Sequence, residues 1–411
     1  MLLTRKRPWR KLEPRSGRQP LRCMFVITSM PVGGAETLLV NLMRKMDPSV
    51  VTPEVVCLKE PGPLGDSIRD EFPVHAHMLS SKWDLRVLPR LAHLFHRREV
   101  DVVVTVGAGD KMFWGRLAAH AAGVPVIASA LHSTGWPDGV GRLNRRLTRI
   151  TDRFIAVANS HGEFLCDFER FPKQKVCVIR NGIDCERFGP DALQRERLRR
   201  ELGVEPSAQL IGIVAALRPE KNHSMLVRAA EKLRQEHPNA HWVVIGDGPE
   251  KAVIESLTRE LNVQDRVHLL GTRHDTHKLL AGLDLFTLCS LNEASPVSIL
   301  EALACEVPVV ATDVGSVSES VVDGETGILI PSEDVDAMSE AVGKLLRNPA
   351  QRKQMGNAGR RLVVEQGSLH SMVQGYQLMM TELYDQRVAF PKVNRMPCRV
   401  SRSDEMVRLT K

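Results

Sequence analysis

Short apolar runs alternate with amphipathic stretches along most of this chain. In the first half the apolar runs fall at residues 23–30, 52–58, 101–107, 125–132, 153–160 and 175–184. In the second half they fall at residues 210–217, 241–248, 266–272, 285–290, 308–313 and 327–330. Apolar strands separated by helices of about 10–15 residues are typical of parallel βαβ units, whose sheets are covered by helices on both faces. The pattern therefore predicts an α/β fold.

The alternation stops once, in a polar and charged stretch at residues 185–208, and then restarts. A chain of 411 residues is also longer than a single hydrophobic core usually supports. We therefore predict two doubly wound, Rossmann-like domains that face each other across a cleft, at residues 21–190 and 191–367. A last helix, at residues 368–388, is expected to pack back on the first domain.

Positive charge is concentrated in two tails, residues 1–20 and 389–411. Residues 1–20 have a net charge of +6 and residues 391–411 a net charge of +4, so the rest of the chain contributes −3 to the total of +7. Basic tails on a slightly acidic body, with only 4% aromatic residues, argue against a nucleic-acid partner. The tails are expected either to be solvated and disordered or to be attracted to anionic lipid headgroups. A third alternative for the first 20 residues is that they precede the true translation start.

Cysteine spacing and the lengths of apolar runs indicate the cellular compartment of the protein. The eight cysteines are scattered, without a CxxC pair or a His/Cys cluster at metal spacing, so neither a disulfide framework nor a metal site is predicted. The basic start is not followed by the apolar stretch of a signal peptide. No apolar run reaches the length of about 18 residues that spans a bilayer. We expect a cytoplasmic protein that could touch the inner face of the cytoplasmic membrane through its basic tails.

Two glutamates lie at the ends of neighbouring predicted elements in the second half. Glu293 follows an apolar run, and Glu301 lies in a predicted helix that Ser295 and Pro296 open. The carboxyl edge of a parallel sheet is where open α/β folds bind ligands. Glu301 could accept hydrogen bonds from both ribose hydroxyls there, and Glu293 could bind sugar hydroxyls. The amides from Ser295 to Val297 could meet a phosphate at the helix start.

A glycine pair, Gly33 and Gly34, follows the first predicted strand and opens a helix. Such a pair lets the backbone approach an anion at the helix N-terminus, although a tight turn alone would also explain it. The third glycine of the dinucleotide fingerprint is missing, which argues against a nicotinamide-dependent dehydrogenase.

Three further strand ends carry candidate residues. Lys221, in a Pro-Glu-Lys-Asn tract, could neutralise a diphosphate, and Arg218 could either help or point to solvent. Gly246 begins a Gly-Asp-Gly-Pro sequence that is most simply a turn but could shape a nucleotide pocket. His132 could be structural or could touch a transferred group.

Taken together, these motifs resemble the retaining glycosyltransferases of family 4, which have the two-domain GT-B fold. The resemblance covers about residues 21–388 and rests on the glycine turn, the tract around Lys221, the Gly-Asp-Gly-Pro turn and the E-x7-E spacing of Glu293 and Glu301. It implies transfer of a sugar from a nucleotide diphosphate donor with retention of configuration, without a required metal or other cofactor. It also implies a donor site mostly in the second domain and, on the first domain, a site for a saccharide or lipid-linked saccharide acceptor. The expected setting is polysaccharide or glycoconjugate biosynthesis.

The resemblance also implies roles for individual residues. Glu301 matches the glutamate that holds ribose, and Glu293 matches the one near the donor sugar. Lys221 matches a diphosphate-binding lysine, Gly34 a glycine whose backbone approaches the phosphates, and His132 an active-site histidine.

The sequence departs from the family pattern at four positions. Ala216 stands where the family usually has an arginine, Ala294 and Glu306 each replace a usual glycine, and Ser316 replaces the second glycine of a pair. Ala216 and Glu306 leave one alternative open, a degenerate, non-catalytic nucleotide-sugar-binding partner of another transferase. A second alternative is a different enzyme class with the same fold, a nucleotide-sugar epimerase.

Overall fold

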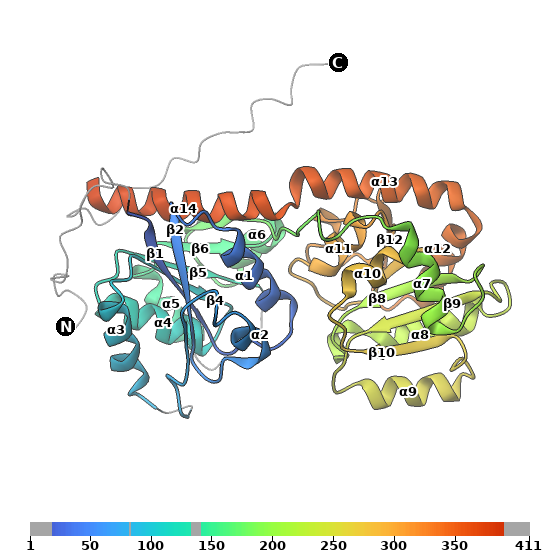
Figure 1. Ribbon diagram of the computed structural model, residues 1–411, viewed down its shortest axis with the longest axis horizontal. Coiled ribbons are helices and arrows are strands. Elements are labelled where there is room, and N and C mark those ends of the chain that lie inside the picture. Colours follow the sequence, from blue (N-terminus) through green and yellow to red (C-terminus); the bar gives the residue numbers. More distant parts are fainter. Residues whose placement is uncertain (1–18, 82–83, 133–140, 390–411) are drawn as a thin grey trace, which may run out of the picture.

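The computed structural model describes residues 19–81, 84–132 and 141–389. Two parallel sheets, each flanked by helices, form two domains that lie side by side along the long axis of the molecule (Figure 1). The predicted fold class, two doubly wound α/β domains, is confirmed. The basic tails lie almost entirely outside the described residues.

The first sheet has seven strands in the order β3-β2-β1-β4-β5-β6-β7. Its strands are β1 (Leu21–Ile27), β2 (Val51–Cys57), β3 (Val74–His75), β4 (Val102–Val106), β5 (Val126–Ala130), β6 (Arg153–Ala156) and β7 (Val176–Val178). The flanking helices are α1 (Gly34–Lys45), α2 (Gly62–Ser67), α3 (Val87–Arg97), α4 (Asp110–Ala121), α5 (Gly141–Arg146) and α6 (Asn159–Asp167). Every residue of β4 and β5 is buried, as expected for apolar central strands covered on both faces.

The second sheet has six strands in the order β10-β9-β8-β11-β12-β13. Its strands are β8 (Gln209–Val214), β9 (Ala240–Ile245), β10 (Val267–Gly271), β11 (Leu285–Leu288), β12 (Val309–Thr312) and β13 (Gly327–Ile330). The helices of this half are α7 (Ala192–Leu202), α8 (His223–Leu233), α9 (Lys251–Glu260), α10 (Thr276–Ala281), α11 (Val297–Ala304), α12 (Val335–Arg347) and α13 (Pro349–Gln366). Strand order reverses between β8 and β11, so the ends of β8 and β11 flank the crevice in which such sheets bind ligands.

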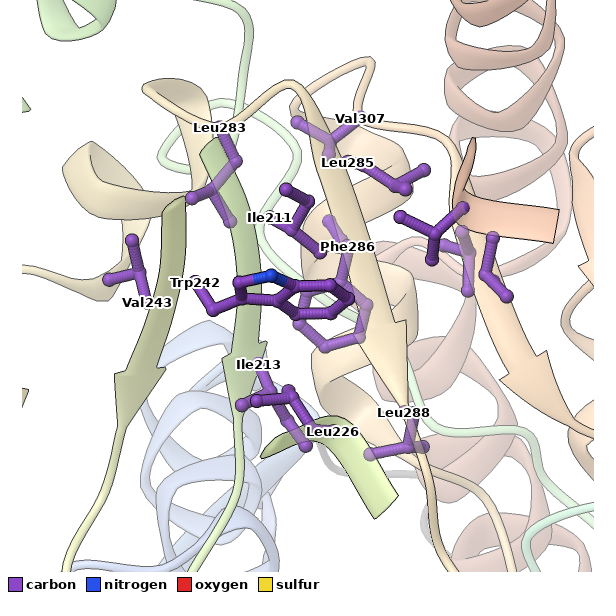
Figure 2. Packing of buried hydrophobic residues seen from close by; sticks show 14 of the residues in the cluster. Ile211, Ile213, Leu226, Trp242, Val243, Leu283, Leu285, Phe286, Leu288 and Val307 are labelled. Carbon is purple, nitrogen blue, oxygen red and sulfur yellow. The ribbon is translucent and has the colours of Figure 1, made fainter. Parts of the chain in front are cut away.

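The buried core of the second domain contains the aromatic side chains of Trp242 and Phe286. Trp242, on β9, is 1% exposed. Figure 2 shows its indole among Ile211 and Ile213 of β8 and Phe286 of β11. Close-packed protein interiors have low compressibility. This core therefore keeps the strands in place, and with them the ends of the loops that leave the strands.

The chain returns to the first domain through its last helix, α14 (Leu369–Ala389), which follows α13 along one edge of both domains (Figure 1). Side chains of α14, among them Met372, Tyr376 and Met380, belong to the same buried cluster as residues of β1 and β4. In the part of the chain that the structure describes, no helix combines the length and apolarity needed to cross a membrane.

Candidate active site

Loops at the carboxyl ends of β8 and β11 bring together two of the predicted residues. Lys221 ends a 3-10 turn, η3 (Pro219–Lys221), between β8 and α8, and Glu293 lies in the loop between β11 and α11. The Lys221 ammonium forms an ion pair with Glu293 Oε1, and Ser290 Oγ donates a hydrogen bond of 2.6 Å to the same oxygen. Buried charges persist when they are paired and hydrogen-bonded. The Glu293 side chain is only 9% exposed. The ion pair therefore holds both the Lys221 ammonium and the Glu293 carboxylate in a fixed orientation.

Glu301 lies on α11, eight positions after Glu293, and its carboxyl group has a different environment. It is half-buried, and the described residues offer its carboxyl group no hydrogen-bond or ion-pair partner. Burial raises the pKa of this carboxyl to about 8, and the charge of Arg187 counteracts only part of that effect. A half-buried acid with a raised pKa and no partner among the described residues is a candidate for contact with a ligand.

Neither Arg218 nor position 216 supplies a second positive charge next to Lys221. The Arg218 side chain is 63% exposed, and its guanidinium lies 4.0 Å from Glu220. The structure therefore places Arg218 toward solvent, one of the two alternatives that the sequence left open. Ala216 is exposed and carries no charge to replace the usual arginine.

Gly246 is needed where β9 ends. Its φ is +146°, and a Cβ there would lie 2.0 Å from the carbonyl oxygen of Ala215. No other residue fits this position, because both the conformation and the space exclude a side chain. The turn after β9 is thereby held against the backbone that follows β8, which fixes the path toward Lys221.

The loop that leads into α11 is held from behind by the segment after β12. Ser316 donates from its backbone N–H to the Glu293 carbonyl over 3.1 Å and from its hydroxyl to the Ala294 carbonyl. From the other domain, Asn181 Nδ2 donates to the Ser295 carbonyl over 3.2 Å. Ser316, a departure from the family pattern, thus has a structural role. Pro296 is the N-cap of α11, and Val297 is its first residue.

Gly315 allows this support to form, so Gly315→Ala should displace Glu293. At a φ of +58°, a Cβ on Gly315 would lie 1.8 Å from the Glu293 carbonyl oxygen. A shift of the Glu293 loop is expected to weaken turnover of a nucleotide sugar by about tenfold or more, since small misplacements of site groups are costly. Steady-state kinetics and thermal unfolding would measure the effect.

Gly324→Ala is the matched control. Gly324 also has a left-handed φ, +76°, but a Cβ there would meet no atom within 4 Å. It should cost only the conformational penalty of about 1 kcal/mol. Equal effects of the two substitutions on turnover would show that contact with Glu293 is not what Gly315 protects.

In the first domain, the glycine pair opens α1. Gly33 is the N-cap with extended backbone, and a Cβ on it would lie 2.5 Å from Glu36 Oε2. Around Gly34 no atom lies within 4 Å of a Cβ position. The protein's own packing therefore does not require a glycine at position 34, and the space beside it is open to a ligand.

His132 lies just past β5 and is half-buried. Burial lowers its pKa to about 4, and the charges of His161 and Lys111 act in the same direction. The imidazole is therefore neutral at physiological pH, so it can donate or accept a hydrogen bond but carries no charge there.

Sequence analysis missed two cations that lie near these groups. Lys111, in the first turn of α4, has its Cε 2.6 Å from where a Cβ on Gly107 would stand, and burial lowers the pKa of its amine. Arg187 donates to the His274 carbonyl over 3.5 Å and lies close enough to Glu301 to affect its pKa. The available signal for Lys111 was the pair of glycines, Gly107 and Gly109, that follows an apolar run shortly before it.

Both halves of the chain match models of glycosyltransferase families. Residues 32–187 match the family described as Glycosyltransferase Family 4, and residues 194–362 match Glycosyl transferases group 1. The GDP-mannose-dependent alpha-(1-6)-phosphatidylinositol monomannoside mannosyltransferase of Mycolicibacterium smegmatis is 30% identical, over 67% of this chain and 74% of that protein. The UDP-Gal:alpha-D-GlcNAc-diphosphoundecaprenol alpha-1,3-galactosyltransferase of Escherichia coli is 28% identical, over 70% of this chain and 78% of that protein.

Solved structures share the fold at lower identity. Anabaena Alr3699/HepE in complex with UDP and glucose superposes with a TM-score of 0.79 at 20% identity, over 88% of this chain and all of that one, 100%. WaaG, a glycosyltransferase involved in lipopolysaccharide biosynthesis, gives a TM-score of 0.69 at 16% identity, over 87% and 99%. With both halves matched by family models and the two-sheet fold in place, this chain belongs to glycosyltransferase family 4 and is a GT-B glycosyltransferase.

Proposed function

We propose that this glycosyltransferase takes a sugar from a nucleoside diphosphate donor and transfers it with retention of configuration, without a required metal. The observation that supports this most is the Glu301 carboxyl, without a partner among the described residues, on the helix that follows the loop of the Lys221–Glu293 ion pair. Glu301 would accept hydrogen bonds from the ribose hydroxyls, and Glu293 would bind the donor sugar.

Catalysis in this proposal is electrostatic. As the bond from the sugar to the diphosphate breaks, negative charge develops on the leaving phosphate, and fixed positive groups stabilise it. Lys221 supplies such a charge, and the backbone amides at the start of α11 and near Gly34 add hydrogen-bond donors. The acceptor hydroxyl would attack from the face that the diphosphate leaves and give its proton to the departing phosphate. We assign no protein nucleophile.

We further propose a saccharide or lipid-linked saccharide as the acceptor, bound on the first domain near His132. The support is chemical and comes from relatives whose names specify a diphosphoundecaprenol-linked sugar and a phosphatidylinositol mannoside. Such acceptors would place the enzyme at the inner face of the cytoplasmic membrane, where the basic tails could meet anionic lipid.

A thermal-shift screen with UDP, GDP, ADP and their sugars tests the donor. One nucleotide should stabilise the protein by about 2.7 kcal/mol at a concentration 100 times its Kd, because binding to the folded state adds to stability by mass action. Glu301→Ala, which lacks the ribose contact, should lose this stabilisation.

Product analysis then tests the reaction. The product anomer should keep the donor's configuration by NMR, and EDTA should leave turnover unchanged. An inverted product would contradict retention, and loss of turnover in EDTA would contradict metal independence. An epimerised nucleotide sugar without acceptor would identify an epimerase, and binding without turnover of any donor would identify a degenerate partner.

A further inference from the structure

One carboxylate of the second domain binds the N-terminus of a helix in the first. Glu319 ends a 3-10 turn, η4 (Val317–Glu319), between β12 and β13. Its Oε2 accepts a hydrogen bond of 2.8 Å from the Asn159 N–H, and its Oε1 accepts two of 2.7 Å from the Ser160 N–H and hydroxyl. The Arg180 guanidinium lies 3.7 Å from Oε2. These contacts of Glu319 with Asn159, Ser160 and Arg180 are here named the interdomain latch.

The helix on which the latch acts has no cap of its own. The N-cap of α6 is Ala158, whose side chain cannot accept a hydrogen bond, whereas α7, α12 and α13 are capped by the adjacent Asp191, Asp334 and Asn348. The first N–H groups of a helix have no partner within the helix, and a nearby anion is favourable there. Figure 1 shows α6 on the side of the first domain that faces the second. Among the described residues, the side-chain cap of α6 thus comes from Glu319 of the second domain.

The charge of Glu319 fits this role. Burial alone would raise the pKa of its carboxyl, but the hydrogen bonds from Ser160 and Asn159 outweigh burial and hold the pKa below its usual value. The carboxylate is therefore ionised at neutral pH, and its hydrogen bonds to α6 are of the stronger, charge-assisted kind.

The segment that carries Glu319 also carries the support of the candidate donor loop. Gly315 packs against the Glu293 backbone, and Ser316 donates to the Glu293 carbonyl over 3.1 Å, only three positions before Glu319. On the same side, Asn181 of the first domain donates to the Ser295 carbonyl. The loop around Glu293 is thus connected to the first domain by two routes.

The space beside the latch is small and partly polar. A cavity of about 30 Å³ lies there, and Arg180, Asn181 and Ser295 are among the residues that line it. It has room for about one or two water molecules. Domain separation at this point would exchange the hydrogen bonds of Glu319 and Asn181 for bonds to water.

We propose that Glu319 is a positioning residue, which through the interdomain latch holds the first domain in register with the Glu293 loop for sugar transfer. The proposal rests on the donor site proposed above. Separation of the domains breaks the latch, leaves the α6 N-terminus uncapped and removes the hydrogen bond from Asn181 to the donor loop. Glu319 touches neither sugar nor diphosphate and acts through α6 and the loop.

Substitution of Glu319 distinguishes a role in positioning the two domains from a role in capping α6 alone. Glu319→Ala should lower the kcat for turnover of the nucleotide sugar by about tenfold, a usual size for coupling between sites. It should still be stabilised by whichever of UDP, GDP or ADP stabilises the wild type, and its radius of gyration with that nucleotide should exceed the wild-type value in small-angle scattering. Glu325→Gln, at an exposed glutamate of the same β12–β13 connection, is the control and should match the wild type.

A second variant supplies the cap locally. Ala158→Ser in the Glu319→Ala background gives α6 an adjacent hydroxyl cap, so it should recover thermal stability but not kcat. If Ala158→Ser restores kcat, or if Glu319→Ala keeps the kcat and radius of Glu325→Gln, the latch is overturned while the donor site stands. If none of UDP, GDP and ADP stabilises the wild type, the donor site is overturned, and the latch proposal with it.

Discussion

Lys221→Ala should lower kcat/KM for the nucleotide sugar by about 100- to 1000-fold, the usual cost of removing one group that stabilises developing negative charge. The effect should be large because Ala216 offers no charge in place of the family's usual arginine, and Arg218 is directed toward solvent near Glu220. Most of the loss should fall on kcat, since the diphosphate gains charge as the sugar leaves. Steady-state kinetics with the donor identified by the nucleotide screen would measure it.

Two controls separate chemistry from folding. Lys221→Ala leaves Glu293 without its ion-pair partner while its side chain is only 9% exposed, so the free energy of unfolding should also fall. The double variant Lys221→Ala/Glu293→Gln removes both charges and should recover stability without recovering activity. Arg228→Ala removes an exposed charge from α8 and should leave both unchanged. A folded Lys221→Ala variant with wild-type kcat/KM would exclude Lys221 from the site.

Glu301→Ala should weaken donor binding by about 100-fold, because a carboxylate that accepts hydrogen bonds from two ribose hydroxyls contributes about 3 kcal/mol. Here the nucleotide alone suffices as the probe, so calorimetric titration with UDP or GDP can measure the change without an acceptor. Glu340→Gln, at an exposed acid on α12 of the same domain, is the matched control. Unaltered nucleotide affinity in Glu301→Ala would contradict the ribose assignment.

The pH dependence of the same site has a definite sign. Burial raises the pKa of the Glu301 carboxyl from 4.5 to about 8, so in the donor-free enzyme the group is mostly protonated at neutral pH. If the ionised form binds ribose, donor affinity should rise as the pH increases toward 8 and level off above it, and Glu301→Gln should abolish this rise.

Stability should change in the opposite direction. Because the folded-state pKa is higher than that of the unfolded chain, the contribution of Glu301 to stability is fully present below pH 4.5 and is lost as the pH rises through about 8. Glu301→Gln should therefore gain stability relative to the wild type at pH 9 compared with pH 5. Loss of donor affinity with a gain of alkaline stability would exclude misfolding as the cause.

The fold class could be predicted from the sequence because the spacing and the length of apolar runs are local properties of the chain. Strands such as β4 and β5 are buried on both faces and therefore appear as continuous apolar runs. The edge strand β3, Val74–His75, was not predicted, since two residues are too few to produce a pattern. It forms because the neighbouring strand β2 offers it a parallel partner.

The candidate site could be predicted less completely. Lys221 and Glu293 were each proposed from a motif, but their ion pair joins positions 72 residues apart and arises only from tertiary structure. Glu319 left no signal of its own, because a glutamate on a short turn is usually solvated. The sequence offers Asn159 and Ser160 as capping residues, and only the structure shows that the N-cap is Ala158.

The course of α14 has a consequence for how this protein comes into being. Buried side chains from Leu369 to Tyr384 complete a core whose other members begin at Leu21, so the first domain lacks one wall until nearly all of the chain has left the ribosome. The second domain can close its own core earlier. The first domain is synthesised first but is thus expected to complete its folding last. Until then its apolar strands are exposed to chaperones or to non-native partners.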